Sequence, residues 1–141
     1  MHDTMETFGY PATLIKAYEH WCVLLRPAQV TLGALILVAK ADVKAFSELP
    51  AAAFAEQAQV VQDIERVLAA FSGFQKMNYM MLMMVDPHVH YHVLPRYEGE
   101  REFDGLAFAD AGWPALPRLD APTPTTPEQN AAIVAALKAL W

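Results

Sequence analysis

The segment His88-Val89-His90-Tyr91-His92-Val93-Leu94-Pro95-Arg96 carries three of the five histidines in this 141-residue chain. A β-strand sends alternate side chains to opposite faces, so a strand here places three imidazoles in a row on one face. Val89, Tyr91 and Val93 then face the other way, and their side chains suit a buried sheet face. Imidazole titrates near physiological pH and is costly to bury without partners. The segment therefore indicates both a strand of the core and a chemical site.

The apolar patterning upstream of this segment predicts further strands and one long helix. Residues 21–25 and 34–39 are compact apolar runs, which are typical of buried strands. Between Phe54 and Phe71 apolar side chains recur at steps of three and four, so we expect an amphipathic helix over 51–71 that ends at Gly73. Residues 12–19 are expected to form a short helix.

The segment 74–85 is rich in methionine, with five of the seven methionines between Met77 and Met84. We expect a strand that is buried on both faces, in preference to a soft binding surface or a thioether metal site. Asp86-Pro87 is a turn signal, so residues 77–94 are expected to form a strand pair that Pro95 closes.

The C-terminal third combines an irregular segment with a closing helix. Five of the ten prolines fall between Pro114 and Pro127, so residues 110–126 are expected to be extended and irregular. Thr126-Pro127-Glu128-Gln129 supplies an N-cap, a proline at the first helical position and a capping box. The order of elements predicts one domain over 1–141 of the α+β class, with a mostly antiparallel sheet and residues 110–141 as a Pro-rich segment plus a terminal helix.

Composition excludes several classes of protein. The formal net charge of −6 argues against binding to a nucleic acid polymer. The apolar run 32–39 is far shorter than the roughly 20 residues of a membrane helix, and residues 1–6 do not resemble a signal peptide. The single cysteine, Cys22, rules out an internal disulfide and fits a reducing compartment, so we expect a cytoplasmic protein without a membrane partner.

Three interpretations of the histidine row remain open on spacing alone. His88, His90 and His92 can share a metal ion, with Asp86 as a fourth or supporting ligand. A neutral imidazole can instead attack a phosphoryl centre, while its neighbours bond the phosphoryl oxygens or protonate the leaving group. The third interpretation gives the histidines a structural role only.

The sequence around the histidines resembles the signature of the histidine triad (HIT) superfamily. Residues 88–96 match the pattern His-φ-His-φ-His-φ-φ, where φ is apolar, followed by Pro-Arg. The order of elements over residues 20–97 is similar as well. This resemblance implies a five-stranded antiparallel sheet with one long helix, a C-terminal helix, and usually a homodimer.

The resemblance also implies hydrolysis or transfer at the α-phosphate of a nucleotide, through a nucleotidyl-histidine intermediate and without a cofactor or a metal. The substrate is then a nucleoside phosphoramidate or a dinucleoside polyphosphate. It makes His90 the nucleophile, His88 an orienting group and His92 a contact to the α-phosphate or the leaving group. Because the third position of the pattern is a histidine, His92, the chain is similar to the hydrolase branches of the superfamily.

Supporting residues depart from the family's pattern. Ala34 stands where many members carry a fourth histidine, and Met83-Met84 stands where hydrolases carry phosphate-contacting side chains. Arg26 stands near a ribose-binding position. Asn78 and Arg96 are the remaining candidates for substrate contacts. A catalytically weak nucleotide-binding protein and a His-rich metal-binding protein are therefore the alternatives.

Overall fold

The computed structural model describes residues 1–141 and contains a five-stranded antiparallel sheet of order β1-β2-β3-β5-β4. This arrangement confirms the α+β class and the antiparallel sheet. The strands are β1 (Leu14–Ala17), β2 (Trp21–Leu25), β3 (Leu35–Ala39), β4 (Lys76–Met80) and β5 (His90–Arg96). β5 lies between β3 and β4, so the histidine segment is internal to the sheet.

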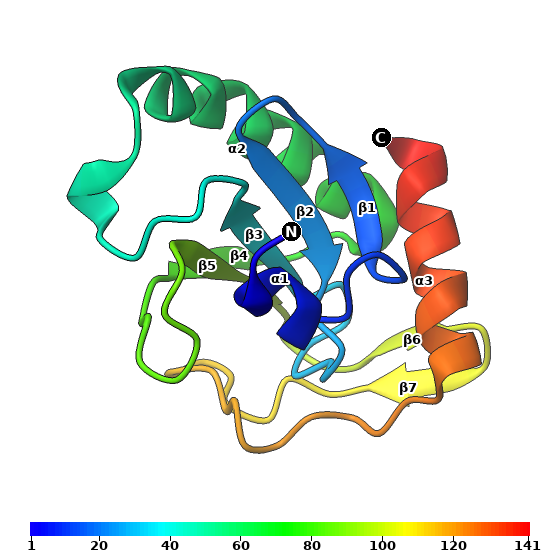
Figure 1. The fold of residues 1–141 in the computed structure, drawn as a ribbon. Helices are drawn as coiled ribbons and strands as arrows, with labels where there is room; N and C mark the ends of the chain where they lie inside the picture. Colours follow the sequence, from blue (N-terminus) through cyan, green and yellow to red (C-terminus); the bar gives the residue numbers. More distant parts are fainter.

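The two faces of the sheet have different covers. The long helix α2 (Ala51–Ser72) packs on one face, where Trp21, Val23 and Leu25 belong to a core cluster of 21 buried residues. Trp21 Nε1 also donates to the carbonyl of Ala53 in α2 at 2.8 Å. The opposite face carries a smaller apolar cluster under α1 (Asp3–Thr7), and Figure 1 shows the two helices on opposite sides of the sheet.

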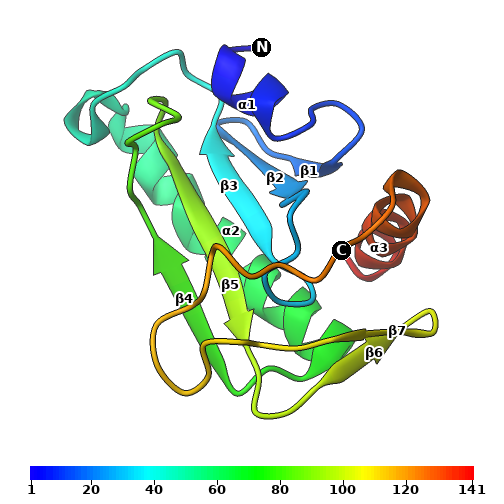
Figure 2. The ribbon, with the colours of Figure 1, turned by 90° about the horizontal axis from the view of Figure 1, so that it is seen from below.

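The chain after β5 returns across the face that α1 leaves open. A hairpin of β6 (Arg101–Phe103) and β7 (Leu106–Phe108) precedes the irregular segment 110–126, which leads to α3 (Pro127–Leu140). Figure 2 shows this segment, in orange, passing in front of β5. Leu119 packs there against the apolar cluster of Val30, Ala34 and Leu94, so the segment covers part of that face.

Local capping signals are confirmed at two helix ends. Helix α2 ends at Gly73, whose φ of 63° is the left-handed conformation that favours glycine. At the start of α3, Thr126 Oγ1 accepts from the backbone N–H of Gln129, and Oε1 of Gln129 accepts from the backbone N–H of Thr126, which is the expected capping box. A short 3₁₀ turn (Phe46–Glu48) precedes α2.

The helix expected over 12–19 is wrong, because the middle of this segment, Leu14–Ala17, is strand β1. Leu14–Ala17 pairs with β2, and the backbone N–H of Tyr18 donates to the carbonyl of Trp21 at 2.7 Å in the connecting turn. Pairing with a buried neighbouring strand overrides local helix propensity here.

The strand expected over 74–85 is also too long, and it is not buried on both faces. β4 ends at Met80, which lies opposite His92, and its side chains are exposed or half-buried. Pro95 does not close β5, since the strand continues to Arg96. The ladder with β3 ends at Val93, so at Pro95 the strand has a partner on one side only, which is a position that tolerates proline.

No helix of the structure combines the length and the apolar character that crossing a bilayer requires.

Candidate active site

His90 is the first residue of β5 and is 2% exposed. Its Nδ1 lies 2.7 Å from the backbone carbonyl oxygen of His88. A carbonyl oxygen can only accept, so Nδ1 carries the ring proton and donates it. The lone pair of the neutral ring is therefore on Nε2, the nitrogen that is free to attack an electrophile.

His92 lies next to His90 on the same face of β5. The centroids of the two rings are 5.2 Å apart, with an interplanar angle of 70°. Arg26, directly after β2, donates from Nε to Nδ1 of His92 at 3.4 Å, so the neutral His92 ring carries its proton on Nε2. Burial is the main cause that lowers the pKa of His92 to about 4, and the positive charge of the neighbouring Arg26 contributes to the same shift. At neutral pH His92 is thus an uncharged donor of an N–H group.

The aromatic ring of Phe8 lies beside the imidazole rings of His90 and His92. Phe8 follows α1, and its ring centroid lies 5.5 Å from that of His90 and 6.0 Å from that of His92. Phe8 belongs to the same apolar cluster as Val38 and Ile36, the β3 residues that pair opposite the two histidines. The short N-terminal helix therefore positions a side chain of the site.

His88 departs from the expected row of three imidazoles, because β5 begins only at His90. The His88 ring turns to other partners: its Nε2 lies 2.6 Å from Oδ1 of Asp42, and its Nδ1 lies 2.8 Å from Oγ1 of Thr4. Since the carboxylate only accepts, Nε2–H donates to Asp42, and Nδ1 accepts from the Thr4 hydroxyl. The part of His88 that reaches His90 is its backbone carbonyl.

A second histidine supports His88 from the N-terminus. The ring of His2 stacks on that of His88, with centroids 4.0 Å apart and an interplanar angle of 6°. His2 Nε2 lies 2.8 Å from the carbonyl oxygen of Ala39, and its Nδ1 accepts from the backbone of Met5 at the start of α1. His2, Thr4 and Asp42 were not identified from the sequence as partners of His88, because all three lie at least 46 positions away in the chain and carry no local signal of the contact.

A cavity of about 190 Å³ opens beside His90 and His92. The remaining lining comes from the segment that connects β4 to β5, a stretch of four apolar residues followed by one carboxylate. These residues are Leu82, Met83, Met84, Val85 and Asp86. Asp86 lies at the expected site but makes no hydrogen bond there, and His88 lines a different cavity with His2 and Asp42.

Arg96 and Asn78 lie on the same sheet face but make no hydrogen bond to the triad. Arg96 is 4% exposed, donates to the carboxylate of Asp110 at 2.7 and 3.1 Å, and donates to Oδ1 of Asn78 at 2.8 Å. Both residues line a cavity of about 460 Å³ that contains Lys76 and Trp113 but no triad histidine. Among the three substrate contacts expected from the sequence, only Arg26 touches a triad ring.

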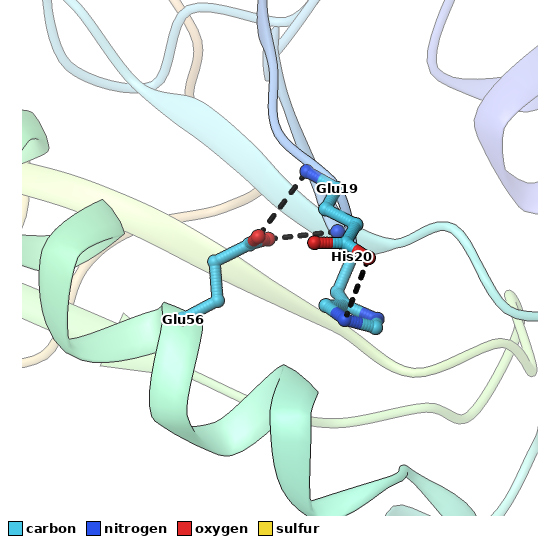
Figure 3. Close-up of side chains that lie close together, drawn as sticks. All are labelled: Glu19, His20 and Glu56. Carbon is cyan, nitrogen blue, oxygen red and sulfur yellow. Dashed lines mark hydrogen bonds and ion pairs between the residues drawn. The ribbon is translucent and has the colours of Figure 1, made fainter.

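A further group of ionisable side chains lies at the turn between β1 and β2, far from the triad in sequence. Potential ligand atoms of Glu19, His20 and Glu56 lie within 4.8 Å of one another (Figure 3). The Glu56 carboxylate, however, accepts the backbone N–H groups of Glu19 at 3.2 Å and of His20 at 2.7 Å. These bonds tie α2 to the turn and explain why the three side chains gather.

Replacing Arg26 by glutamine is expected to raise the pKa of His92 from about 4 toward the ordinary value of 6.5, because it removes the positive charge that lies beside the His92 ring. Burial persists in the variant, so the rise is partial. Titration of the imidazole resonances by NMR measures the value. Arg118→Gln, at an exposed pair with Asp120, is the matched control and leaves the His92 titration unchanged.

The same pKa shift has a consequence for stability. Between pH 6.5 and about 4 the unfolded chain protonates His92 while the folded protein keeps it neutral. The free energy of unfolding therefore falls as the pH is lowered through this range, and the His92 contribution to this fall is smaller in Arg26→Gln. A His92 ring that titrates near 6.5 in the wild-type protein contradicts both expectations.

Comparison with known proteins gives one family. The model of the HIT domain matches residues 10–99 of the chain. A search of curated proteins finds no match to the sequence of this chain.

Solved structures share the fold at low sequence identity. A histidine triad (HIT) protein from Sinorhizobium meliloti has a TM-score of 0.76 at 22% identity, with coverage of 100% of this chain and 96% of that chain. A histidine triad protein from Bradyrhizobium japonicum has a TM-score of 0.71 at 17% identity, with coverage of 100% and 97%. A Zn-bound histidine triad family protein from Mycobacterium smegmatis has a TM-score of 0.61 at 23% identity, with coverage of 92% and 86%.

Proposed function

The chain belongs to the HIT domain family, and on this premise we propose that it is a nucleotide hydrolase or transferase that acts at an α-phosphate through a nucleotidyl-histidine intermediate on His90. The substrate class in this proposal is a nucleoside phosphoramidate or a dinucleoside polyphosphate. A nucleotide as the small-molecule partner and a homodimeric state are part of the proposal on the strength of the family alone.

The observation that carries the proposal is the hydrogen bond from Nδ1 of His90 to the carbonyl of His88. It holds the tautomer in which Nε2 has a lone pair, and an imidazole nucleophile requires that lone pair. In the first step a bond forms between Nε2 and phosphorus, while the leaving group departs with its bonding electron pair and takes up a proton from water. A water molecule then attacks phosphorus and loses a proton to the solvent, while the N–P bond breaks and its electron pair returns to Nε2 of His90.

His92 and Arg26 supply the groups that a negatively charged phosphoryl centre requires. Because His92 is neutral at pH 7, its Nε2–H serves as a hydrogen-bond donor to a phosphoryl oxygen and not as a strong acid. Arg26 is the cation in contact with the triad. We assign the orienting role to His88 through its backbone, which Asp42 and Thr4 hold in place.

The alternatives are a catalytically weak nucleotide-binding protein and a His-rich metal-binding protein, and the structure supports them to different degrees. Ala34 is fully buried in an apolar cluster with Leu94 and leaves no polar group where many relatives carry a histidine, which favours a catalytically weak nucleotide-binding protein. A metal site of the three triad imidazoles has less support, since His88 is bound to Asp42 and Thr4 and lines a separate cavity.

The test is to trap the intermediate. Purified protein is mixed with adenosine phosphoramidate or with diadenosine tetraphosphate, quenched within seconds, and digested for mass spectrometry. The proposal expects a nucleotidyl group on the peptide that contains His90. Tight nucleotide binding without any trapped adduct supports the binding protein instead, and a stoichiometric metal ion that survives dialysis supports the metal protein.

A further inference from the structure

We propose that the segment Leu82–Asp86 is the leaving-group subsite and that it selects substrates with an uncharged, apolar leaving group. The favoured substrate is then a nucleoside phosphoramidate of an apolar amine, and dinucleoside polyphosphates are poor substrates. This inference rests on the proposed function, because it assigns the side of the cavity opposite the nucleophile.

The position of the segment follows from the lining of the cavity. Two kinds of residue surround it: the triad rings of His90 and His92 from the sheet, and the segment Leu82–Asp86. In-line displacement places the leaving group on the side of phosphorus away from the attacking Nε2. A leaving group that departs from a phosphorus atom above His90 therefore moves along the segment.

The side chains of the segment are apolar and uncovered. Leu82, Met84 and Val85 are 47%, 85% and 92% exposed, although they lie beside a buried pair of histidines. Met81 and Met83 pack against the main core instead and anchor the segment between them. Met83 has a φ of 49°, which is uncommon for a residue other than glycine and which bends the backbone at this point. The apolar side chains thus form a surface that an apolar ligand can cover.

The charges near the cavity disfavour a polyphosphate leaving group. Asp86 is the charged residue of the segment, and it lies on the leaving-group side. Arg26 contacts His92 from the end of β2, while Lys76 and Arg96 line the separate cavity of about 460 Å³. A nucleoside diphosphate or triphosphate that leaves along the segment brings several negative charges next to Asp86 and meets no cation there, whereas an apolar amine meets methionine, leucine and valine side chains.

The selectivity is measured with three adenosine substrates that differ only in the leaving group: the unsubstituted phosphoramidate, the N-hexyl phosphoramidate and diadenosine tetraphosphate. We expect kcat/KM for the hexyl compound to exceed that for the unsubstituted compound by about 10- to 100-fold, the range expected for filling an apolar subsite. The tetraphosphate is expected to be the slowest of the three.

Two variants assign the preference to the segment. The double variant Met84→Gln with Val85→Thr is expected to reduce the ratio of hexyl to unsubstituted kcat/KM at least several-fold. Asp86→Asn is expected to raise the rate of the tetraphosphate relative to the unsubstituted phosphoramidate. Leu140→Gln removes an apolar side chain of 37% exposure at the end of α3, so it is the matched control and keeps the wild-type ratios.

The outcomes separate this inference from the proposed function. If adenosine phosphoramidate labels His90 and is turned over, but the hexyl compound has no advantage, the leaving-group assignment is wrong and the proposed function stands. A preference that survives the double variant also overturns the assignment. If no substrate yields a nucleotidyl adduct on His90, both fail.

Discussion

Replacing His90 by alanine is expected to lower kcat/KM for adenosine phosphoramidate by about 10⁴-fold or more, because removal of a nucleophile eliminates the covalent step. The variant is expected to fold, since the lost ring makes one hydrogen bond, to the carbonyl of His88, and lies beside an open cavity. Single-turnover release of AMP gives the rate, and circular dichroism with urea unfolding reports the fold.

The matched control for this prediction is His20→Ala. His20 lies at the turn between β1 and β2, where its backbone N–H and not its ring is held by Glu56. We expect this variant to keep wild-type turnover and to form the nucleotidyl adduct. Wild-type turnover in His90→Ala removes His90 from the mechanism, and equal losses in both variants indicate a general effect on the fold.

Replacing Asp110 by alanine is expected to lower the free energy of unfolding by about 3–5 kcal/mol, the usual cost of breaking a buried ion pair by removing one partner. The side chains of Arg96 and Asp110 are 5% and 1% exposed. The Asp110 carboxylate accepts from the Arg96 guanidinium and also from the backbone N–H groups of Tyr97 and Gly112. Its loss leaves the buried guanidinium without its counter-charge. Urea denaturation measures the change.

Two further variants separate charge from packing at this site. Arg96→Met combined with Asp110→Leu removes both charges and is expected to recover much of the lost stability, because it leaves no unpaired buried charge. Asp120→Ala breaks the exposed pair with Arg118 and is expected to change stability little. If Asp110→Ala is as mild as Asp120→Ala, the buried pair does not hold segment 110–126 on the sheet.

Features that depend on neighbouring residues were predicted well. The structure matches the helix predicted over 51–71 and its end at Gly73, the strand over 21–25 and the Thr126 capping box. These features depend on apolar spacing and on cap hydrogen bonds, both of which involve residues only a few positions apart in the chain. The helix expected over 12–19 failed because the pairing of β1 with β2 decides its backbone, and a pattern of eight residues carries no information about that partner.

The histidine site also combines features that the sequence predicts with features that only the tertiary structure shows. The alternation of residues 88–96 placed His90 and His92 on one face, because two-residue periodicity is a property of the strand itself. The strand's starting point at His90, and with it the turning of the His88 ring toward Asp42 and Thr4, required the tertiary structure.

The sequence by itself determined the class of fold, the long helix and the alternation that places His90 and His92 on one face of a strand. Only the tertiary structure decided which nitrogen of each ring carries the proton, that burial together with Arg26 keeps His92 neutral, and that Arg96 is paired with Asp110. The physical reason is that tautomers and pKa values depend on the nearest donors, acceptors and charges. In this protein, most of those groups come from residues far away in the chain.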